Sequence, residues 1–316
     1  MSNASLRAPA ETAVKQCMGL QADESCVIVT DDQRTAIGEA LYAVATEITG
    51  DTAFVRYPPG DQHGGEPPEP VAAAMAGADV VLAPTTKSIS HTRARSAAQE
   101  AGARIATLPG ITDGVFLMGL DADYEQIRGA CEETLAQVDG AGEIRVTSPQ
   151  GTAITLRPGA REWRMDTGIV HEPGDFSNLP AGEVFVSPET ADGTIVVDGT
   201  MMPHGALDGR EITIQVEDGM VTSVDDPALR EELEDAAAEA GDAAYNLAEL
   251  GIGTNVAVTD LVGSVLLDEK AGGTVHFAIG DDHGIGGDTS APIHLDGILT
   301  DPTVYADGTE VELPRP

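Results

Sequence analysis

The chain has 316 residues, enough for one large or two medium domains with a sizeable core that forms unaided. Its 53 acidic and 17 basic residues give a net charge of −36, so the chain lacks the cationic surface that nucleic acids and anionic membranes attract. Because 41% of its residues are hydrophobic, we expect a folded protein despite this charge.

Lysine is scarce, with only Lys15, Lys87 and Lys270 among the basic residues. Such an acid-rich, lysine-poor composition is typical of halophilic proteins from a salt-loaded cytoplasm, so we expect a cytoplasmic protein. The three cysteines are odd in number and lack C-x-x-C spacing, which argues against a disulfide framework and a cysteine metal site. No apolar run approaches the roughly 20 residues of a membrane-spanning helix, and we expect no membrane partner.

The first half of the chain alternates short β-branched runs with helical segments. Strands are predicted at Ser25 to Thr30, Thr52 to Tyr57, Val80 to Ala83 and Arg104 to Leu108. Helices are predicted at Leu41 to Glu47, Val71 to Ala76, Thr92 to Ala101 and Tyr124 to Val138. This alternation predicts right-handed βαβ crossovers and an α/β domain with a mainly parallel sheet.

From Glu143 onward the pattern changes to short strands separated by Gly and Pro turns. One long helix, about Pro227 to Leu247, interrupts them, and two further strands surround His276 and His294. We therefore predict an α/β domain over residues 1–147, followed by an α+β domain over residues 148–316 that carries any metal site.

Three common functional motifs are absent or incomplete in this chain. The chain has no G-x-x-x-x-G-K-[ST] phosphate loop and no G-x-S-x-G nucleophile elbow. His171 and Glu172 begin like a zinc-protease H-E-x-x-H motif, but Pro173 and Gly174 prevent the helix that would present both histidines.

A histidine cluster near the C-terminus is the strongest candidate site. His276, His283 and His294 fall within 19 residues of a chain that has seven histidines. His294 and Asp296 occupy a predicted strand, where residues two apart face the same side. Mixed nitrogen and oxygen ligands suit zinc, manganese, cobalt or iron.

Four segments in order resemble the aminopeptidase T, or M29, metallopeptidase family, as a short form of these leucyl-aminopeptidase-like enzymes. They are NLPAGEVFVSPETADGTIVVDGTM (178–201), AELGIGTN (248–255), DEKAGGTVHFAIGD (268–281) and SAPIHLDGIL (290–299). The segment ISHTRARSAAQEAGARIATLPGIT (89–112) resembles the α/β region of that family less specifically.

The resemblance implies a set of metal ligands that extends beyond the histidine cluster: Glu183, Glu249, His276, His294 and Asp296. It also places His283 where these peptidases have a tyrosine, so we expect His283 to be a further ligand or a catalytic residue; the alternative is a solvated loop histidine. Glu249 is either a ligand or the group that carries a proton to the leaving amine.

A site of this kind can hold two divalent ions, Zn, Co or Mn, about 3.5 to 4 Å apart with a bridging carboxylate. The resemblance therefore implies a metallo-aminopeptidase, a hydrolase that removes N-terminal residues from peptides, and it leaves a homodimer open. The histidines and the aspartate also meet the two-histidine, one-carboxylate preference of non-heme iron. The alternative is a mononuclear Fe(II) ring-opening dioxygenase resembling 2,5-dihydroxypyridine 5,6-dioxygenase, acting on a small-molecule substrate. A non-catalytic metal-binding relative is a third reading.

Overall fold

The computed structural model describes residues 5–315, and the chain divides into two compact units. The first comprises the residues up to Arg128 together with Asp166–Ala181, and the second comprises Gly129–Met165 and the residues from Gly182 onward. The expected single boundary at residue 147 does not describe this division. The chain leaves the first unit along a helix and later returns to it to add one strand, β8.

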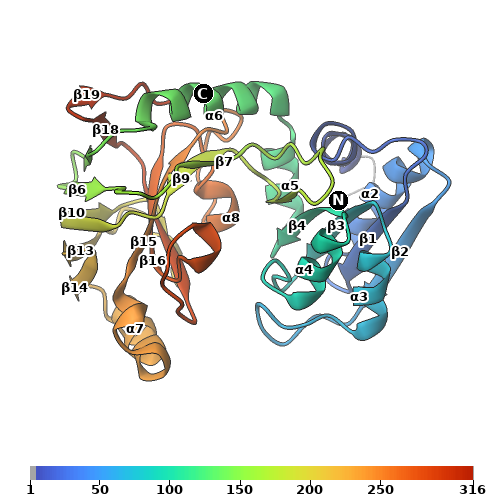
Figure 1. Ribbon diagram of the computed structural model, residues 1–316, viewed down its shortest axis with the longest axis horizontal. Coiled ribbons are helices and arrows are strands. Elements are labelled where there is room, and N and C mark those ends of the chain that lie inside the picture. The colour runs from blue at the N-terminus through green and yellow to red at the C-terminus, as the bar shows by residue number, and fades with distance from the viewer. Residues whose placement is uncertain (1–4, 316) are drawn as a thin grey trace. The chain divides into compact units, whose positions relative to one another are not determined.

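The first unit contains a five-stranded sheet in which every pairing is parallel, with the order β2-β1-β3-β4-β8 (Figure 1). Its strands are β1 (Cys26–Asp31), β2 (Thr52–Tyr57), β3 (Val80–Thr85), β4 (Arg104–Pro109) and β8 (Phe176–Asn178). Its helices are α1 (Arg7–Glu11), a π-helix (Thr12–Cys17), α2 (Thr35–Ile48), α3 (Glu69–Ala76), α4 (Arg93–Glu100) and α5 (Asp113–Leu120). The predicted α/β domain with a mainly parallel sheet is confirmed.

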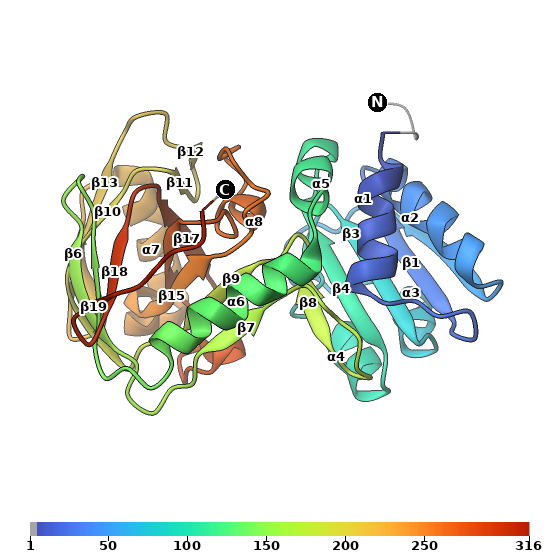
Figure 2. The same cartoon turned by 90° about the horizontal axis from the view of Figure 1, so that it is seen from above.

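Helices cover both faces of this sheet (Figure 2). Val27 and Val29 of β1 belong to a buried apolar cluster with Met75 of α3 and Ala98 of α4. Residues of β1 alternate between faces, so Thr30 points the other way, where Gly38 of α2 lies close to it. This three-layer arrangement buries the short apolar runs completely, which explains why β1 and β3 read as continuous hydrophobic stretches.

The second unit contains two seven-stranded sheets, and its strands pair mostly antiparallel. The first has the order β14-β13-β10-β6-β5-β18-β19. Its strands are β5 (Ile144–Thr147), β6 (Ala153–Arg157), β10 (Thr190–Val197), β13 (Ile212–Glu217), β14 (Met220–Val224), β18 (Thr303–Ala306) and β19 (Thr309–Glu310).

The other sheet, which we call the site sheet, has the order β12-β11-β17-β16-β15-β9-β7. Its strands are β7 (Arg164–Asp166), β9 (Glu183–Val186), β11 (Thr200–Met201), β12 (Gly205–Ala206), β15 (Leu247–Gly253), β16 (Val275–Gly280) and β17 (His294–Leu299). Gly297 of β17 lies against Val197 of β10, so one face of the site sheet packs on the first sheet. His294 and Asp296 alternate with Gly297 and therefore occupy the opposite face.

Helices and short turns complete the second unit. They are α6 (Tyr124–Val138), which crosses the division at Arg128, α7 (Pro227–Ala240), a 3-10 turn (Gly241–Tyr245), α8 (Val265–Asp268) and a 3-10 turn (His283–Ile285). The predicted α+β character of this part of the chain is confirmed. Among residues 5–315, no helix combines the length and the apolarity that a bilayer crossing requires.

The long helix ends earlier than predicted. Asp226 caps its start by accepting a hydrogen bond from the Leu229 amide, and Pro227 occupies its first turn. Gly241, with a positive φ of 63°, ends it. Leu247, predicted as helical, begins strand β15 instead.

Candidate metal centre

His276 of β16 and His294 of β17 face the same side of the site sheet. In the antiparallel pairing of β16 with β17, Ala278 lies opposite Asp296 and Gly280 lies opposite His294. His276 is two residues from Ala278, so its imidazole emerges on the face that carries His294 and Asp296. The alternation predicted for His294 and Asp296 thus places both side chains beside His276.

The two glutamates reach this face from neighbouring strands. Glu249 of β15 lies opposite Ala278, next to a bulge that shifts the register after Leu247. Glu183, the first residue of β9, lies opposite Gly253 of β15. Adjacent strands therefore bring together all five residues that the resemblance implied as ligands.

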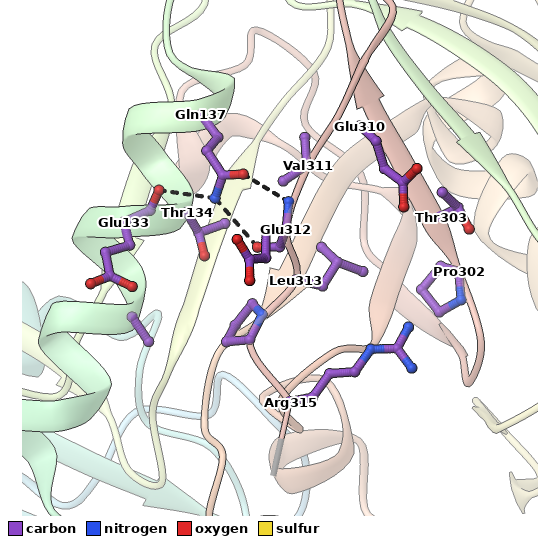
Figure 3. A pocket seen from close by; sticks show the side chains of 12 residues that line it. Glu133, Thr134, Gln137, Pro302, Thr303, Glu310, Val311, Glu312, Leu313 and Arg315 are labelled. Carbon is purple, nitrogen blue, oxygen red and sulfur yellow. Dashed lines mark hydrogen bonds between the residues drawn. The ribbon is translucent and has the colours of Figure 1, made fainter.

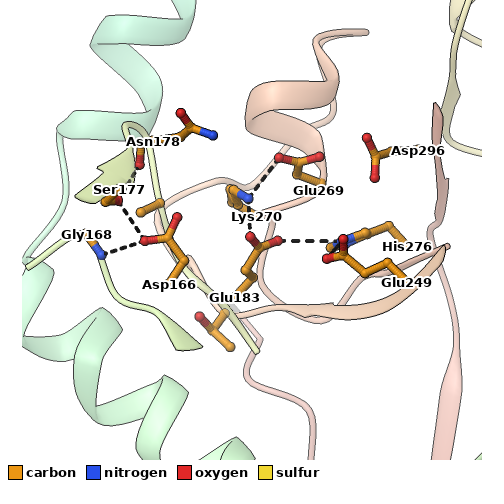
Figure 4. A network of polar contacts seen from close by, with 12 residues as sticks. Asp166, Gly168, Ser177, Asn178, Glu183, Glu249, Glu269, Lys270, His276 and Asp296 are labelled. Carbon is orange, nitrogen blue, oxygen red and sulfur yellow. Dashed lines mark hydrogen bonds and ion pairs between the residues drawn. The ribbon is translucent and has the colours of Figure 1, made fainter. Parts of the chain in front are cut away.

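These side chains form two groups, each able to hold a cation, that share Glu249. In the first group, Nε2 of His276 lies 3.5 Å from Oε2 of Glu183 and 3.3 Å from Oε1 of Glu249 (Figure 4). In the second group, Nε2 of His294 lies 3.3 Å from Oε2 of Glu249 and 3.4 Å from Oδ1 of Asp296. Each imidazole thus faces two carboxylates, and the two oxygens of Glu249 face different imidazoles.

The two groups differ in exposure to solvent. Glu183, Glu249 and His276 are all buried, whereas the His294 side chain is 33% exposed. A molecule arriving from solvent therefore meets the His294 side of the site.

A hydrogen bond fixes the orientation of His294. Its Nδ1 lies 2.7 Å from the carbonyl oxygen of Asp281, which can only accept, so Nδ1 carries the proton and donates. Nε2 is consequently the atom directed at Glu249 and Asp296. A carbonyl contact of this kind is the usual support of a metal-ligating histidine.

Burial and neighbouring charges shift the pKa values of the centre in opposite directions. Burial raises the pKa of Glu183 to about 8, although the charge of Lys270 opposes this effect. Burial by itself would lower the pKa of His276, but the hydrogen bond to Glu249 and the charge of Glu183 raise it to about 9. Burial also disfavours ionisation of Glu249, yet the contacts with His276 and His294 hold its pKa below the usual range.

The donor set fits a divalent transition metal. The four imidazole–carboxylate separations of 3.3 to 3.5 Å, which include the long hydrogen bond between His276 and Glu249, exceed the 2.7 to 3.2 Å that is usual from N–H to O. Ligands bound at about 2.0 to 2.2 Å around one ion lie about 3 to 3.5 Å apart. Within residues 5–315, the buried Oε2 of Glu183 has no hydrogen-bond donor, and it lies 3.5 Å from Nε2 of His276.

Two further residues of the centre were missed by the sequence analysis. Lys270 is buried and its ammonium contacts Oε1 of Glu183, and it also lies 2.8 Å from Oε1 of Glu269 (Figure 4). Glu269 lies close enough to Asp296 that the two charges interact. The scarcity of lysine was the available signal, because one of only three lysines lies between two acidic residues and a glycine-rich turn.

His283 is not brought into either group by the structure. It is exposed on a 3-10 turn that directly follows the buried Asp282. Asp282 holds this loop by accepting hydrogen bonds from the Ser187 hydroxyl and the Thr289 amide. The loop is thus anchored through Asp282. The placement of His283 does not support the ligand or catalytic role that the sequence analysis expected.

A hollow on the second unit is separate from this centre. It measures about 550 Å³ and lies between α6 and the C-terminal segment (Figure 3). Gln137 spans it by accepting from the Glu312 amide at 2.7 Å and donating to the Glu312 carbonyl at 3.3 Å. None of the candidate ligands lines it.

Two solved structures share this fold over nearly the whole chain. The 2,5-dihydroxypyridine dioxygenase from Pseudomonas putida KT2440 is 21% identical, with a TM-score of 0.81 over 99% of this chain and 97% of that one. AmpT from Thermus thermophilus is 19% identical, with a TM-score of 0.71 over 97% and 96% of the two chains. At these identities the likeness shows that this chain has the fold shared by both proteins.

Among proteins with this fold, the chain belongs to the 2,5-dihydroxypyridine 5,6-dioxygenase family, NicX, whose family model matches residues 8–312. No curated protein sequence matches it. The expectation of a hydrolase is wrong, because the matching family is one of dioxygenases. The quoted segments reflect the fold shared with AmpT, and a likeness in fold does not specify the reaction.

Proposed function

We propose that this protein is an iron-dependent dioxygenase that opens the ring of 2,5-dihydroxypyridine or a closely related hydroxylated ring. Membership of the dioxygenase family supports this reaction. The observation that carries the proposal is the pair of imidazoles, His276 and His294, on either side of one buried carboxylate, Glu249.

This arrangement supplies the donors that non-heme iron(II) oxygenases use, two imidazoles and a carboxylate. Glu249, His294 and Asp296 would hold the ion, and His276, which faces the other oxygen of Glu249, would complete the donor set. Iron bound there would supply the one-electron chemistry that dioxygen requires.

The protein's own residues have three tasks. The carbonyl of Asp281 keeps a proton of His294 on Nδ1, so that Nε2 is the atom left to bind the ion. The buried carboxylates concentrate negative charge, which favours a divalent cation. The partial exposure of His294 leaves an approach for the substrate, while His276 and Glu249 are shielded from water.

Oxygen consumption tests the proposal. Metal-free protein would be loaded anaerobically with Fe(II), mixed with 2,5-dihydroxypyridine, and followed by an oxygen electrode and by mass spectrometry. We expect one O₂ consumed per ring opened, with both oxygen atoms of labelled O₂ in the product and no peroxide. Iron binding without oxygen uptake would instead identify a non-catalytic metal-binding relative.

A further inference from the structure

Lys270 is a buried cation built into the centre. Its side chain is 4% exposed, whereas that of Lys15 is 48% exposed. The Lys270 ammonium contacts both Glu183 and Glu269, and its backbone amide donates to the Leu267 carbonyl at 3.0 Å. Backbone and side chain together fix the ammonium against Glu183.

This contact distinguishes the two groups that share Glu249. In the first group, one oxygen of Glu183 faces His276 and the other is occupied by Lys270. Across residues 5–315, neither Glu249 nor Asp296 forms an ion pair with a lysine or an arginine. One group therefore already has a resident positive charge, and the other does not.

We propose that the ammonium of Lys270 takes the place of a second metal ion. The centre then binds one divalent ion through Glu249, while Glu183 forms an ion pair with Lys270. The inference rests on the metal centre of the proposed function and explains how a site with two ligand groups remains mononuclear. A divalent ion between Glu183 and His276 would share a carboxylate with the ammonium, and buried charges of like sign repel with little screening. Lys270 is thus a positioning residue that sets the number of ions.

Metal stoichiometry of the whole chain tests this role without any turnover. Metal-free protein would be titrated with Mn²⁺ by calorimetry, and the bound metal would be counted after dialysis. We expect one ion per chain in the unaltered protein and two in Lys270→Met, where the second position has lost its competing charge. Lys270→Arg keeps the charge and should bind one ion. Lys15→Met removes an exposed lysine of the other unit and should also bind one.

The outcomes separate this inference from the proposed function. An unaltered protein that binds no Mn²⁺ removes both the metal centre and the inference. One ion in the unaltered protein and one in a folded Lys270→Met overturns the role of Lys270 and leaves the metal centre standing. Two ions bound to the unaltered protein would also overturn the role proposed for Lys270.

A second variant keeps the test decisive if Lys270→Met fails to fold with Glu183 unpaired. The double variant Lys270→Met with Glu183→Gln removes both buried charges. Because the ion is bound through Glu249, we expect this variant to retain one ion, with a dissociation constant within about threefold of the unaltered protein, less than the effect of losing a supporting residue. Loss of that ion would show that Glu183 is a ligand and would overturn the inference.

Discussion

Gly251 lies directly opposite His276 where β15 pairs with β16, and the imidazole of His276 occupies the space that a side chain at Gly251 would fill. A β-carbon there would lie 2.0 Å from Cε1 and 2.2 Å from Nε2 of His276. Real β-carbons do not approach other atoms this closely, so the glycine is a condition for the observed position of the imidazole.

We expect Gly251→Ala to displace His276 and weaken metal binding by about 10- to 100-fold, the effect of a disturbed supporting residue. Overpacking should also destabilise the fold by about 1 to 3 kcal/mol. Calorimetric Mn²⁺ titration and urea unfolding measure the two effects. Gly129→Ala, at a glycine of α6 with open space around it, is the control for metal binding. Native affinity in Gly251→Ala would show that His276 does not bind the ion.

Glu249→Gln should cost the most metal affinity of any single change, since both oxygens of this carboxylate face imidazoles. We expect a loss of more than about 100-fold, because the substitution removes an anionic ligand and not a supporting contact. Equilibrium dialysis against Mn²⁺ measures it. Glu217→Gln, an exposed change on β13, should leave the affinity as it is. Equal affinities in the two variants would contradict a centre built around Glu249.

His283→Ala and His294→Ala form a matched pair of histidine removals. His294 faces two carboxylates, whereas His283 is exposed and lies in neither group. We expect His294→Ala to lose the ion and His283→Ala to retain it with unchanged stoichiometry, as measured by metal analysis after dialysis. Loss of the ion from His283→Ala would mean that the loop after Asp282 closes over the centre when metal binds.

Molar salt should stabilise the protein. A net charge of −36 produces self-repulsion, and the Debye length shrinks from about 10 Å at 0.1 M salt to about 3 Å at 1 M. We expect the melting temperature to rise by at least about 5 °C between these two KCl concentrations, which for a unit of about 150 residues corresponds to roughly 1.5 kcal/mol or more. A melting temperature that does not change would refute the halophilic character inferred from composition.

Acid should weaken the first unit through Glu24. Hydrogen bonds from Arg104, at 2.7 and 2.8 Å, hold the pKa of Glu24 below its usual range. The pair therefore stabilises the fold fully above the unfolded-state pKa of about 4.3, and this contribution is lost as the pH falls through the lower folded-state value.

Glu24→Gln should cost about 1 to 3 kcal/mol at neutral pH, since it leaves the charge of the nearly buried Arg104 unmatched. The loss should shrink between about pH 5 and pH 3, where the unaltered protein also loses the pair. Urea unfolding across this range measures both trends, with the exposed Glu232→Gln as control. A cost that does not vary with pH would contradict the assignment to this ion pair.

Local pattern was sufficient for much of the fold. The strand at Thr52–Tyr57 and the helix at Tyr124–Val138 begin and end where hydrophobic periodicity predicts. Periodicity reports on neighbouring residues, so it works where an element is decided locally. It extended the helix after Pro227 too far, because the 3-10 turn Gly241–Tyr245 that separates this acidic, alanine-rich helix from the following strand shows little beyond Gly241 to mark the change.

The sequence by itself also determined that His294 and Asp296 face the same side, since strand alternation is a local property. Only the tertiary structure decided that Glu183 and Glu249 join them, because this depends on the pairing of β9, β15 and β16, segments that lie far apart in the chain. The burial of Lys270 has the same origin. An acidic chain offers many carboxylates, and the folded sheet selects the few that share one face with two imidazoles and a buried ammonium.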